Sequence, residues 1–229
     1  MIIYGKQLFL HVLQKYPKRI RCVYLPKKCD EKLFSKIAKA TDKICTIDNQ
    51  KAQALSHGGN HQGFIADIED LEFSSFLEAK KGSFLVILNE ITDTGNIGAI
   101  LRSAYVFGAD AVIISGIKNI NLEAIVRTSS GAAFELPIVL YPSTLDMIHE
   151  LKQMGFGLYG ADMNGTDVRK IQFSKKKALI MGSEGKGLSA KVKERLNAIV
   201  SINMAREFDS LNVSAATAVL CDRIINGQN

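Results

Sequence analysis

The amino-acid sequence predicts an α/β protein in two parts, and three observations lead to this prediction. Short apolar runs of strand length alternate with segments of helical periodicity along almost the whole chain. The alternation is interrupted at residues 69–82, where acids, serines and lysines are mixed without a clear period. The formal charge changes across the same stretch: residues 1–68 hold 12 Lys or Arg and 5 Asp or Glu, and residues 69–229 hold 17 and 18. We therefore predict a basic N-terminal domain (1–68), a linker (69–82) and a second domain (83–229).

The N-terminal domain is expected to alternate helices and strands. The predicted helices are residues 6–15 and 31–40, and the predicted strands are 20–25, 43–47 and 63–68. The segment SHGGNHQG, just before the last strand, is typical of a turn-rich loop. His57 and His61 have the i, i+4 spacing of a helical metal pair, but the two glycines between them disfavour a helix. No metal site is predicted.

The second domain shows the alternation more clearly. The predicted strands are residues 84–88, 111–114, 136–140, 157–160, 178–181 and 198–202, and the predicted helices are 97–107, 122–129, 144–154, 189–196 and 212–225. Short apolar strands with helices between them imply a parallel sheet that is covered on both faces.

Length and composition exclude several classes of protein. No apolar run in the 229 residues approaches the length of about 20 that a membrane span needs. The N-terminal segment does not have the layout of a signal peptide. The four cysteines lie far apart with no C-x-x-C pair, so neither a zinc site nor a disulfide framework is indicated. A cytoplasmic location is expected.

Basic residues are concentrated near the N-terminus, where the first 29 residues contain no acid. Clustered cations gain affinity for a phosphate backbone by releasing its condensed counterions. A well-solvated surface is the simpler interpretation, but the asymmetry favours a polyanionic partner. The residues predicted to bind RNA are Lys15, Lys18, Arg19, Arg21, Lys27 and Lys28.

Three polar clusters follow predicted strands of the second domain, at the sheet edge where ligands bind in open α/β folds. They are NEITDTGN with the helix after it, GSEGKG, and INMAREFDSLN. Arg102 lies roughly 140° from Ile97 around the first helix, away from the stripe expected to face the core. In the third cluster Ser210 is the candidate N-cap of the last helix, and Asn212 is expected in its first turn.

The glycine loop does not have the spacing of a nucleotide-phosphate loop. Only three residues separate Gly182 from Lys186, whereas the Walker pattern needs more, and the G-x-G-x-x-G spacing is reversed. Glu184 would also place a negative charge beside a phosphate. The four histidines lie outside the three clusters, which disfavours a Ser-His-Asp or Cys-His mechanism. A nucleotide-dependent oxidoreductase is therefore a weak alternative.

The three clusters resemble the motifs of the SpoU (TrmH) family of RNA ribose 2′-O-methyltransferases, within the SPOUT superfamily. The first motif, N-x-G-x-x-x-R-[ST]-A, matches Asn96, Gly98, Arg102, Ser103 and Ala104. The second, G-[SA]-E-G-x-G, matches residues 182–187, and the third, built on S-L-N-V-S, matches residues 210–214. In the N-terminal domain, IYGKQLFLHVL and HQGFIADI resemble the ribosomal-protein-L30e-like substrate domain of the RlmB-type enzymes, which methylate a guanosine ribose in 23S rRNA.

The resemblance implies a fold, a cofactor and partners. The fold is a small L30e-like α/β domain followed by a SPOUT α/β-knot domain, whose parallel sheet carries a C-terminal trefoil knot. The cofactor is S-adenosyl-L-methionine, the substrate is RNA, and the assembly is a homodimer. The positions that correspond to cofactor contacts are Gly182, Ile202, Met204 and Leu211.

Site roles are also carried over by the resemblance. The family arginine that matches Arg102 is proposed as the proton acceptor, but a guanidinium stays protonated in proteins and is a poor base. We expect Arg102 to clamp a phosphate and stabilise the developing alkoxide instead. The residues expected to position it and the ribose are Asn96, Glu184, Ser210 and Asn212.

The sequence departs from the family pattern beside the third motif. Asn203 stands where the family commonly has proline, and Arg206 stands where it has glycine. These changes leave open an RNA-binding or assembly factor that has lost catalysis. The other alternative to a 23S rRNA methyltransferase is a tRNA ribose methyltransferase, which in its minimal form would lack the L30e-like N-terminal domain.

Overall fold

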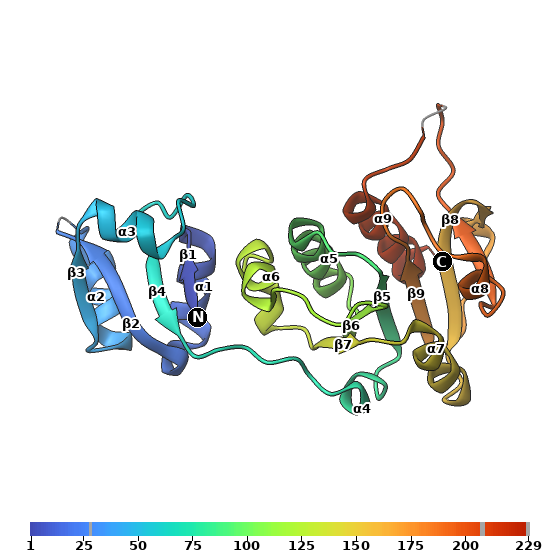
Figure 1. Ribbon diagram of the computed structural model, residues 1–229, viewed down its shortest axis with the longest axis horizontal. Helices are drawn as coiled ribbons and strands as arrows, with labels where there is room; N and C mark the ends of the chain where they lie inside the picture. Colours follow the sequence, from blue (N-terminus) through green and yellow to red (C-terminus); the bar gives the residue numbers. More distant parts are fainter. Residues whose placement is uncertain (28, 207–208, 228–229) are drawn as a thin grey trace. The chain divides into compact units, whose positions relative to one another are not determined.

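The computed structural model describes residues 1–27, 29–206 and 209–227 of the chain. The chain divides into two compact units, each with its own sheet (Figure 1). The first consists of Met1–Glu72 with Leu122–Gly131, and the second consists of Phe73–Asn121 with Ala132–Asn229. The division between Glu72 and Phe73 falls inside the stretch that the sequence predicts to be a linker.

The N-terminal unit is built on a four-stranded sheet in the order β1-β4-β2-β3. Its strands are β1 (Ile2–Tyr4), β2 (Ile20–Pro26), β3 (Ile44–Ile47) and β4 (Ile65–Ile68). β4 pairs antiparallel with β1 and β2, and β2 pairs parallel with β3. Its helices are α1 (Lys6–Lys15), α2 (Glu31–Ala40), α3 (Asn49–Leu55) and α6 (Leu122–Thr128), with a 3-10 turn at Pro17–Arg19.

Local sequence explains these helices. Helix α1 buries one apolar stripe at helical spacing, made of Leu8, Phe9, Val12 and Leu13. Asp30 and Asp48 cap α2 and α3, because each side chain accepts the backbone N–H three residues further on. The caps satisfy amides that have no partner inside the helix, which fixes where each helix begins.

The second unit is built on a six-stranded parallel sheet in the order β10-β8-β9-β5-β6-β7. Its strands are β5 (Phe84–Asn89), β6 (Ala111–Ser115), β7 (Ile138–Tyr141), β8 (Gly157–Asp167), β9 (Lys177–Met181) and β10 (Ala198–Ser201). Every residue of β5 and β6 is buried, as a parallel sheet with two covered faces requires.

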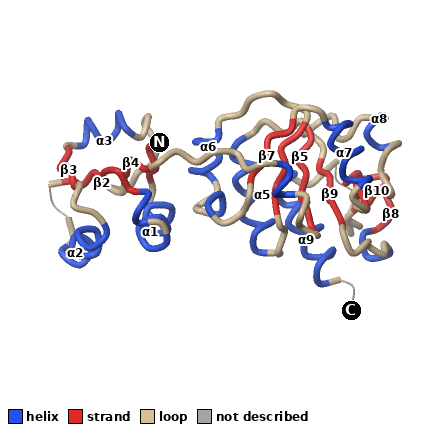
Figure 2. The backbone as a smooth tube through the Cα atoms, turned by 90° about the horizontal axis from the view of Figure 1, so that it is seen from below, coloured by secondary structure: helices blue, strands red, loops and turns tan. Residues whose placement is uncertain are grey.

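Helices cover both faces of this sheet (Figure 2). One face packs Leu85, Ile113 and Ile180 against α4 (Phe76–Ala79), α7 (Thr144–Gln153) and α8 (Ala190–Lys193). The opposite face is covered by α5 (Thr94–Val106) and α9 (Val213–Asn226), which pack against each other. The carboxyl ends of β5, β9 and β10 thus lead into the segments that carry the three polar clusters.

Most predicted elements are present, but several boundaries are wrong. The helix expected at 189–196 is only Ala190–Lys193, because Asn197 exchanges hydrogen bonds with Leu158 and draws the chain into β10. The strand expected at 136–140 begins at Ile138. The strand expected to end at Gly160 continues to Asp167, because its last residues pair with Val200 and Ser201. The sequence also missed β1, α3 and the short helix α4, which lies within the predicted linker.

Candidate active site

The loop after β9 is a tight glycine turn. The Gly187 N–H donates to the Ser183 carbonyl oxygen at 2.8 Å, and the two residues form an isolated antiparallel bridge. Gly185, at the tip, has a φ of 81°, a conformation that glycine adopts at little cost. A Cβ at Gly182 would overlap the backbone of Gly187 and Leu188. The glycines therefore allow the chain to fold back on itself directly after the strand, with Glu184 and Lys186 exposed at the tip.

The first motif begins at the N-terminus of α5, directly after β5. Asp93 caps this helix, since its Oδ1 accepts the Asn96 N–H at 2.6 Å. The cap fixes the first turn, in which Asn96 is half-buried. Asn96 thus stands at the carboxyl end of β5 with its backbone held, and its side-chain amide remains available for other partners.

The third motif caps the last helix, but not through the residue that the sequence suggested. Asn212 is the N-cap of α9: its Oδ1 accepts the Ser214 N–H at 2.9 Å and the Ala215 N–H at 3.4 Å. The prediction that Ser210 caps the helix, with Asn212 inside its first turn, is wrong. The helix begins at Val213, so the side chain of Ser210 lies too far back to reach the amides of its first turn.

A chain of hydrogen bonds joins the three motifs. Asn212 Nδ2 donates to Asn96 Oδ1 at 3.1 Å, and Asn96 Nδ2 donates to Glu184 Oε1 at 2.6 Å. The Ser214 hydroxyl also donates to Asn212 Oδ1, at 2.6 Å. Asn96 and Asn212 are separated by 116 positions of sequence. We call Asn96, Glu184 and Asn212, joined in this way, the polar network.

The groups at the two ends of the polar network determine which atom of each side-chain amide donates and which accepts. A backbone N–H can only donate, so the amide of Asn212 must turn its oxygen to Ser214 and its nitrogen to Asn96. Asn96 must then turn its oxygen to Asn212 and its nitrogen to Glu184. The ionised carboxylate of Glu184 can only accept, which agrees with this direction. Both amide orientations therefore follow from chemistry, and the network ends on a negative charge.

Arg102 and Ser210, the other two predicted catalytic residues, are not part of the network. Arg102 is exposed on α5, six residues after Asn96, which is about 9 Å along the helix axis. Among the described residues, Arg102 makes no hydrogen bond or ion pair with the network, and neither does Ser210, which is exposed just before α9. The structure therefore brings together Asn96, Glu184 and Asn212 but not all five residues.

An open cavity of about 580 Å³ lies beside β10. The segment after this strand supplies Ile202, Met204 and Arg206, and β8 supplies Met163 and Gly165, with further lining from Asp167, Lys170, Ser201, Asn203 and Ala205. A Cβ at Gly165 would meet the backbone of Ile199 and Val200 at 2.7–2.8 Å, so this glycine allows β8 to approach β10 closely.

Two of the four predicted cofactor residues line this cavity, namely Ile202 and Met204. Gly182 lies in the glycine turn, and Leu211 is 41% exposed just before α9; neither belongs to the lining. The sequence missed Met163 and Asp167, because β8, which carries them, was expected to end earlier, and it missed Lys170 in the 3-10 turn that follows β8. The polar stretch DMNGTD offered no alternating apolar pattern from which a continuing strand could be inferred.

Ion pairs set the charge around the cavity. Arg169 Nε donates to both oxygens of Asp167 at 3.0 Å, and this bonding lowers the pKa of Asp167 to about 2. Lys193 pairs with Asp162 at 2.5 Å, and its hydrogen bond lowers the pKa of Asp162 below the usual value. Both carboxylates therefore stay ionised at neutral pH.

The residues predicted to bind RNA lie on the N-terminal unit. Lys15 ends α1, Lys18 and Arg19 belong to the following 3-10 turn, and Arg21 is an exposed residue of β2. Lys27 is exposed directly after β2. Lys28 lies outside the described residues.

The described part of the chain offers neither a cluster of metal ligands nor a membrane-spanning helix. No group of three or more His, Cys, Asp or Glu side chains there could hold a metal ion. None of the helices it contains is long and apolar enough to cross a membrane.

The six-stranded parallel sheet carries, at its carboxyl edge, a glycine turn and a polar network that joins the three motifs. The SpoU rRNA Methylase family matches residues 83–222, and the RNA 2′-O ribose methyltransferase substrate binding domain matches residues 2–74. The chain belongs to the SpoU rRNA methylase family. The predicted family and fold class are confirmed.

The two relatives described next align with most of this chain and with most of their own length. An uncharacterized tRNA/rRNA methyltransferase of Borreliella burgdorferi is 32% identical over 86% of this chain and 94% of its own. The 23S rRNA (guanosine-2′-O-)-methyltransferase RlmB of Haemophilus ducreyi is 31% identical over 97% of this chain and 96% of its own. The crystal structure of the SpoU methyltransferase AviRb from Streptomyces viridochromogenes, in complex with AdoMet, superposes with a TM-score of 0.78 at 23% identity, covering 98% and 89% of the two chains.

Proposed function

We propose that the protein transfers a methyl group from S-adenosylmethionine to the 2′-hydroxyl of a ribose in 23S rRNA, at a guanosine. The observation that carries the proposal is the polar network, because it joins the three family motifs at the edge of the sheet where α/β folds bind ligands. The substrate is suggested by the RlmB relative, which aligns with nearly the whole chain, including the N-terminal unit.

The residues present fit S-adenosylmethionine. An adenosine needs backbone donors and acceptors with an apolar slot, and the cofactor carries no phosphate. The glycine turn at Gly182 supplies exposed main chain, and Ile202 and Met204 supply apolar lining to the open cavity. When bound, S-adenosylmethionine supplies an electrophilic methyl group. Gly182, Ile202, Met204 and Leu211 hold it in this proposal.

The polar network positions the ribose. Asn96 holds Oε1 of Glu184 at 2.6 Å, which leaves Oε2 of the carboxylate to accept a hydrogen bond from a ribose hydroxyl. Because the Asn212 amide is fixed by the backbone of α9, neither amide can rotate without breaking a bond. The carboxylate is therefore oriented before RNA arrives, which reduces the cost of ordering it in the complex. Ser210 stands beside Asn212 in the chain and assists in positioning.

Arg102 clamps a phosphate of the target nucleotide and stabilises the negative charge that develops on the attacking oxygen. A guanidinium matches the two oxygens of a phosphate and does not give up its proton, which suits a clamp better than a base. The exposure of Arg102 on α5 supports this role, because the side chain is accessible to RNA.

The N-terminal unit binds RNA, and the protein acts in the cytoplasm as a homodimer. The positive balance of residues 1–68, and Lys15, Lys18, Arg19, Arg21 and Lys27, support RNA binding. Dimerisation is supported by large apolar side chains exposed on α5 and α9, which a partner would cover. They are Tyr105 (43% exposed), Val106 (74%), Val219 (37%) and Ile225 (41%).

One observation favours a second candidate, an RNA-binding factor without catalysis. Asn203 and Arg206, which replace the family's usual proline and glycine, both line the cavity beside β10. Arginine adds bulk and charge there, and asparagine lacks the fixed φ of proline that would preorganise the loop. Weak cofactor binding would follow if these changes close the site.

Two measurements test the proposal. Calorimetry with S-adenosylmethionine should give saturable binding, and its absence would favour the non-catalytic factor. Ribose methylation mapped across rRNA and tRNA, from cells with and without the protein, should show one 23S rRNA guanosine that loses its methyl group. A lost methyl group in tRNA would identify the rival substrate instead.

A further inference from the structure

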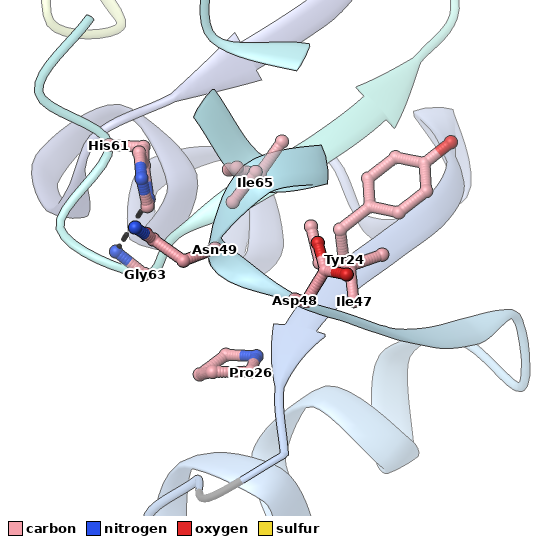
Figure 3. Close-up of a pocket in the computed structure, with 9 residues that line it drawn as sticks. Tyr24, Pro26, Ile47, Asp48, Asn49, His61, Gly63 and Ile65 are labelled. Atoms are coloured by element: carbon pink, nitrogen blue, oxygen red, sulfur yellow. Dashed lines mark hydrogen bonds between the residues drawn. The ribbon is translucent and has the colours of Figure 1, made fainter. Parts of the chain in front are cut away.

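The N-terminal unit contains a cavity that the methyl-transfer site does not use. It has a volume of about 80 Å³, enough for a small planar group rather than a single water (Figure 3). The lining comes from five places in the chain: the end of β2, the end of β3, the start of α3, the loop of residues 56–63, and Ile65 at the start of β4. This loop is the turn-rich segment SHGGNHQG.

The floor and one wall of the cavity are apolar. Ile47, Ala52 and Ile65 are at most 7% exposed and form a small core of their own, against which Tyr24 packs. Tyr24 and Ile65 lie directly opposite each other on β2 and β4, so the register of the sheet places both side chains on the face that lines the cavity. Burial raises the pKa of the Tyr24 hydroxyl above its usual value, and the ring stays neutral. These surfaces suit a flat, largely apolar group.

The opposite wall is polar and is fixed in orientation. His61 Nδ1 accepts the Gly63 N–H at 3.0 Å, so in the neutral ring the proton is on Nε2. The side-chain amide of Gln53 lies 3.3 Å from Nε2, and with the proton on Nε2 its oxygen is the atom that accepts from the ring. In the view of Figure 3, Asn49 extends from the start of α3 toward His61 and Gly63. Asn49 thus offers both a donor and an acceptor beside a ring of set tautomer.

The loop that carries His61 is held in an uncommon conformation. Gln62 has a φ of 51°, which non-glycine residues seldom adopt, and Gly63 has a φ of 79°. A Cβ at Gly63 would lie 4.0 Å from Pro26, on the opposite side of the cavity opening. Strain of this kind persists where the surrounding structure requires it, often at a binding site.

We propose that this cavity receives an unpaired nucleobase of the RNA that the protein binds. Sequence-specific RNA recognition places splayed bases against aromatic or histidine rings and reads their edges with hydrogen bonds. Tyr24 and His61 supply the rings, and Asn49 reads the edge. The site lies among residues 1–68, whose charge balance of +7 would hold the flanking phosphates, and Lys27 is exposed directly after Pro26 of the lining. The inference rests on the proposed function only in that both require RNA as the ligand.

The test compares two RNA probes on the full chain. One is a fluorescein-labelled single strand of about twelve nucleotides and mixed sequence, a length in the usual range of single-strand sites. The other is the same strand annealed to its complement, at the same salt concentration, because salt alone changes such affinities. The variants are Asn49→Ala, which removes the edge contact, and Ala52→Leu, which fills the cavity. Gln50→Ala is the matched control, since Gln50 is exposed on the same helix outside the lining.

Asn49→Ala and Ala52→Leu should each weaken binding of the single strand about tenfold and leave binding of the duplex unchanged. Gln50→Ala should bind both probes as the wild type does. Equal affinities of wild type and Asn49→Ala for the single strand would overturn the proposal, as would an equal loss for both probes. Asn49 is an exposed residue, so this variant decides the question even if Ala52→Leu fails to fold. Calorimetry of wild type with S-adenosylmethionine is run in parallel; absent binding there would overturn the methyl-transfer function and leave the result for the nucleobase cavity intact.

Discussion

The side chain of Asn212 has two structural roles, and two substitutions separate them. Its Oδ1 caps α9, and its Nδ2 holds the amide of Asn96, which in turn holds Glu184. Asn212→Ala removes both functions. Asn212→Asp keeps an oxygen for the cap, because Asp and Asn cap helices about equally well, but it removes the donor to Asn96. The pair of variants therefore distinguishes stability from positioning.

The expected changes in stability and turnover follow from the hydrogen bonds that each substitution removes. Loss of the cap in Asn212→Ala costs about 1 kcal/mol, which for a chain of this length lowers the Tm by about 2–4 °C. In Asn212→Asp the stability is kept. However, the new carboxylate faces Asn96 Oδ1, and two acceptors repel each other. We expect Asn96 to turn its amide nitrogen to the new carboxylate, which breaks its bond to Glu184. A hydrogen bond to a charged group is worth about 1.5 kcal/mol at the low end of its range, or about tenfold in turnover.

The assay is transfer of tritiated methyl from S-adenosylmethionine to rRNA that lacks the modification, with thermal melting of the same samples. We expect Asn212→Asp to have the Tm of the wild type and the same affinity for S-adenosylmethionine, with a turnover about tenfold lower. Wild-type turnover in Asn212→Asp would refute the orienting role of the network. An unchanged Tm in Asn212→Ala would refute the capping role.

Three further predictions concern other parts of the site. Arg102→Ala should lower turnover by about 10²–10³ with cofactor affinity unchanged, and Arg102→Lys should recover only part of the loss; near wild-type turnover in either would show that Arg102 is not catalytic. Gly182→Ala should weaken S-adenosylmethionine binding at least tenfold in calorimetry, because its Cβ would overlap the backbone of Gly187; unchanged affinity would exclude the glycine turn from the cofactor site. The pKa of Asp167 is lowered to about 2 by Arg169, so the stability it contributes is present above about pH 4 and is lost as the pH falls through 2. In urea melts between about pH 4 and pH 2, the free energy of unfolding of Asp167→Asn should decline less steeply than that of the wild type. Parallel declines would show that the pairing of Asp167 with Arg169 does not contribute to stability.

Local sequence was sufficient wherever one element's own residues decide its form. Helix α2 has the predicted bounds, because Asp30 caps it and its apolar residues recur at helical spacing. The buried strands β5 and β6 were also predicted, since continuous apolar runs between turns suit a sheet that is covered on both faces.

The sequence was insufficient wherever a partner elsewhere in the chain sets the outcome. β8 runs on to Asp167 because Val200 and Ser201 pair with its polar end, and the Ser201 hydroxyl donates to the Gly165 carbonyl oxygen at 2.9 Å. Nothing local distinguishes this stretch from a loop. Ser210 and Asn212 are both good capping residues, and only the point at which α9 begins decides between them.

By itself the sequence determined the fold class, the basic character of the N-terminal part and the three motifs, since residue type, periodicity and spacing are properties of contiguous chain. Only the tertiary structure decided that Asn96 and Asn212 share a hydrogen bond, that Ile202 and Met204 line a cavity with Met163, and that Asn49 and His61 border a second cavity. A cavity or a shared bond exists only when separate segments are brought together, and strand order, register and the start of each helix determine which segments meet.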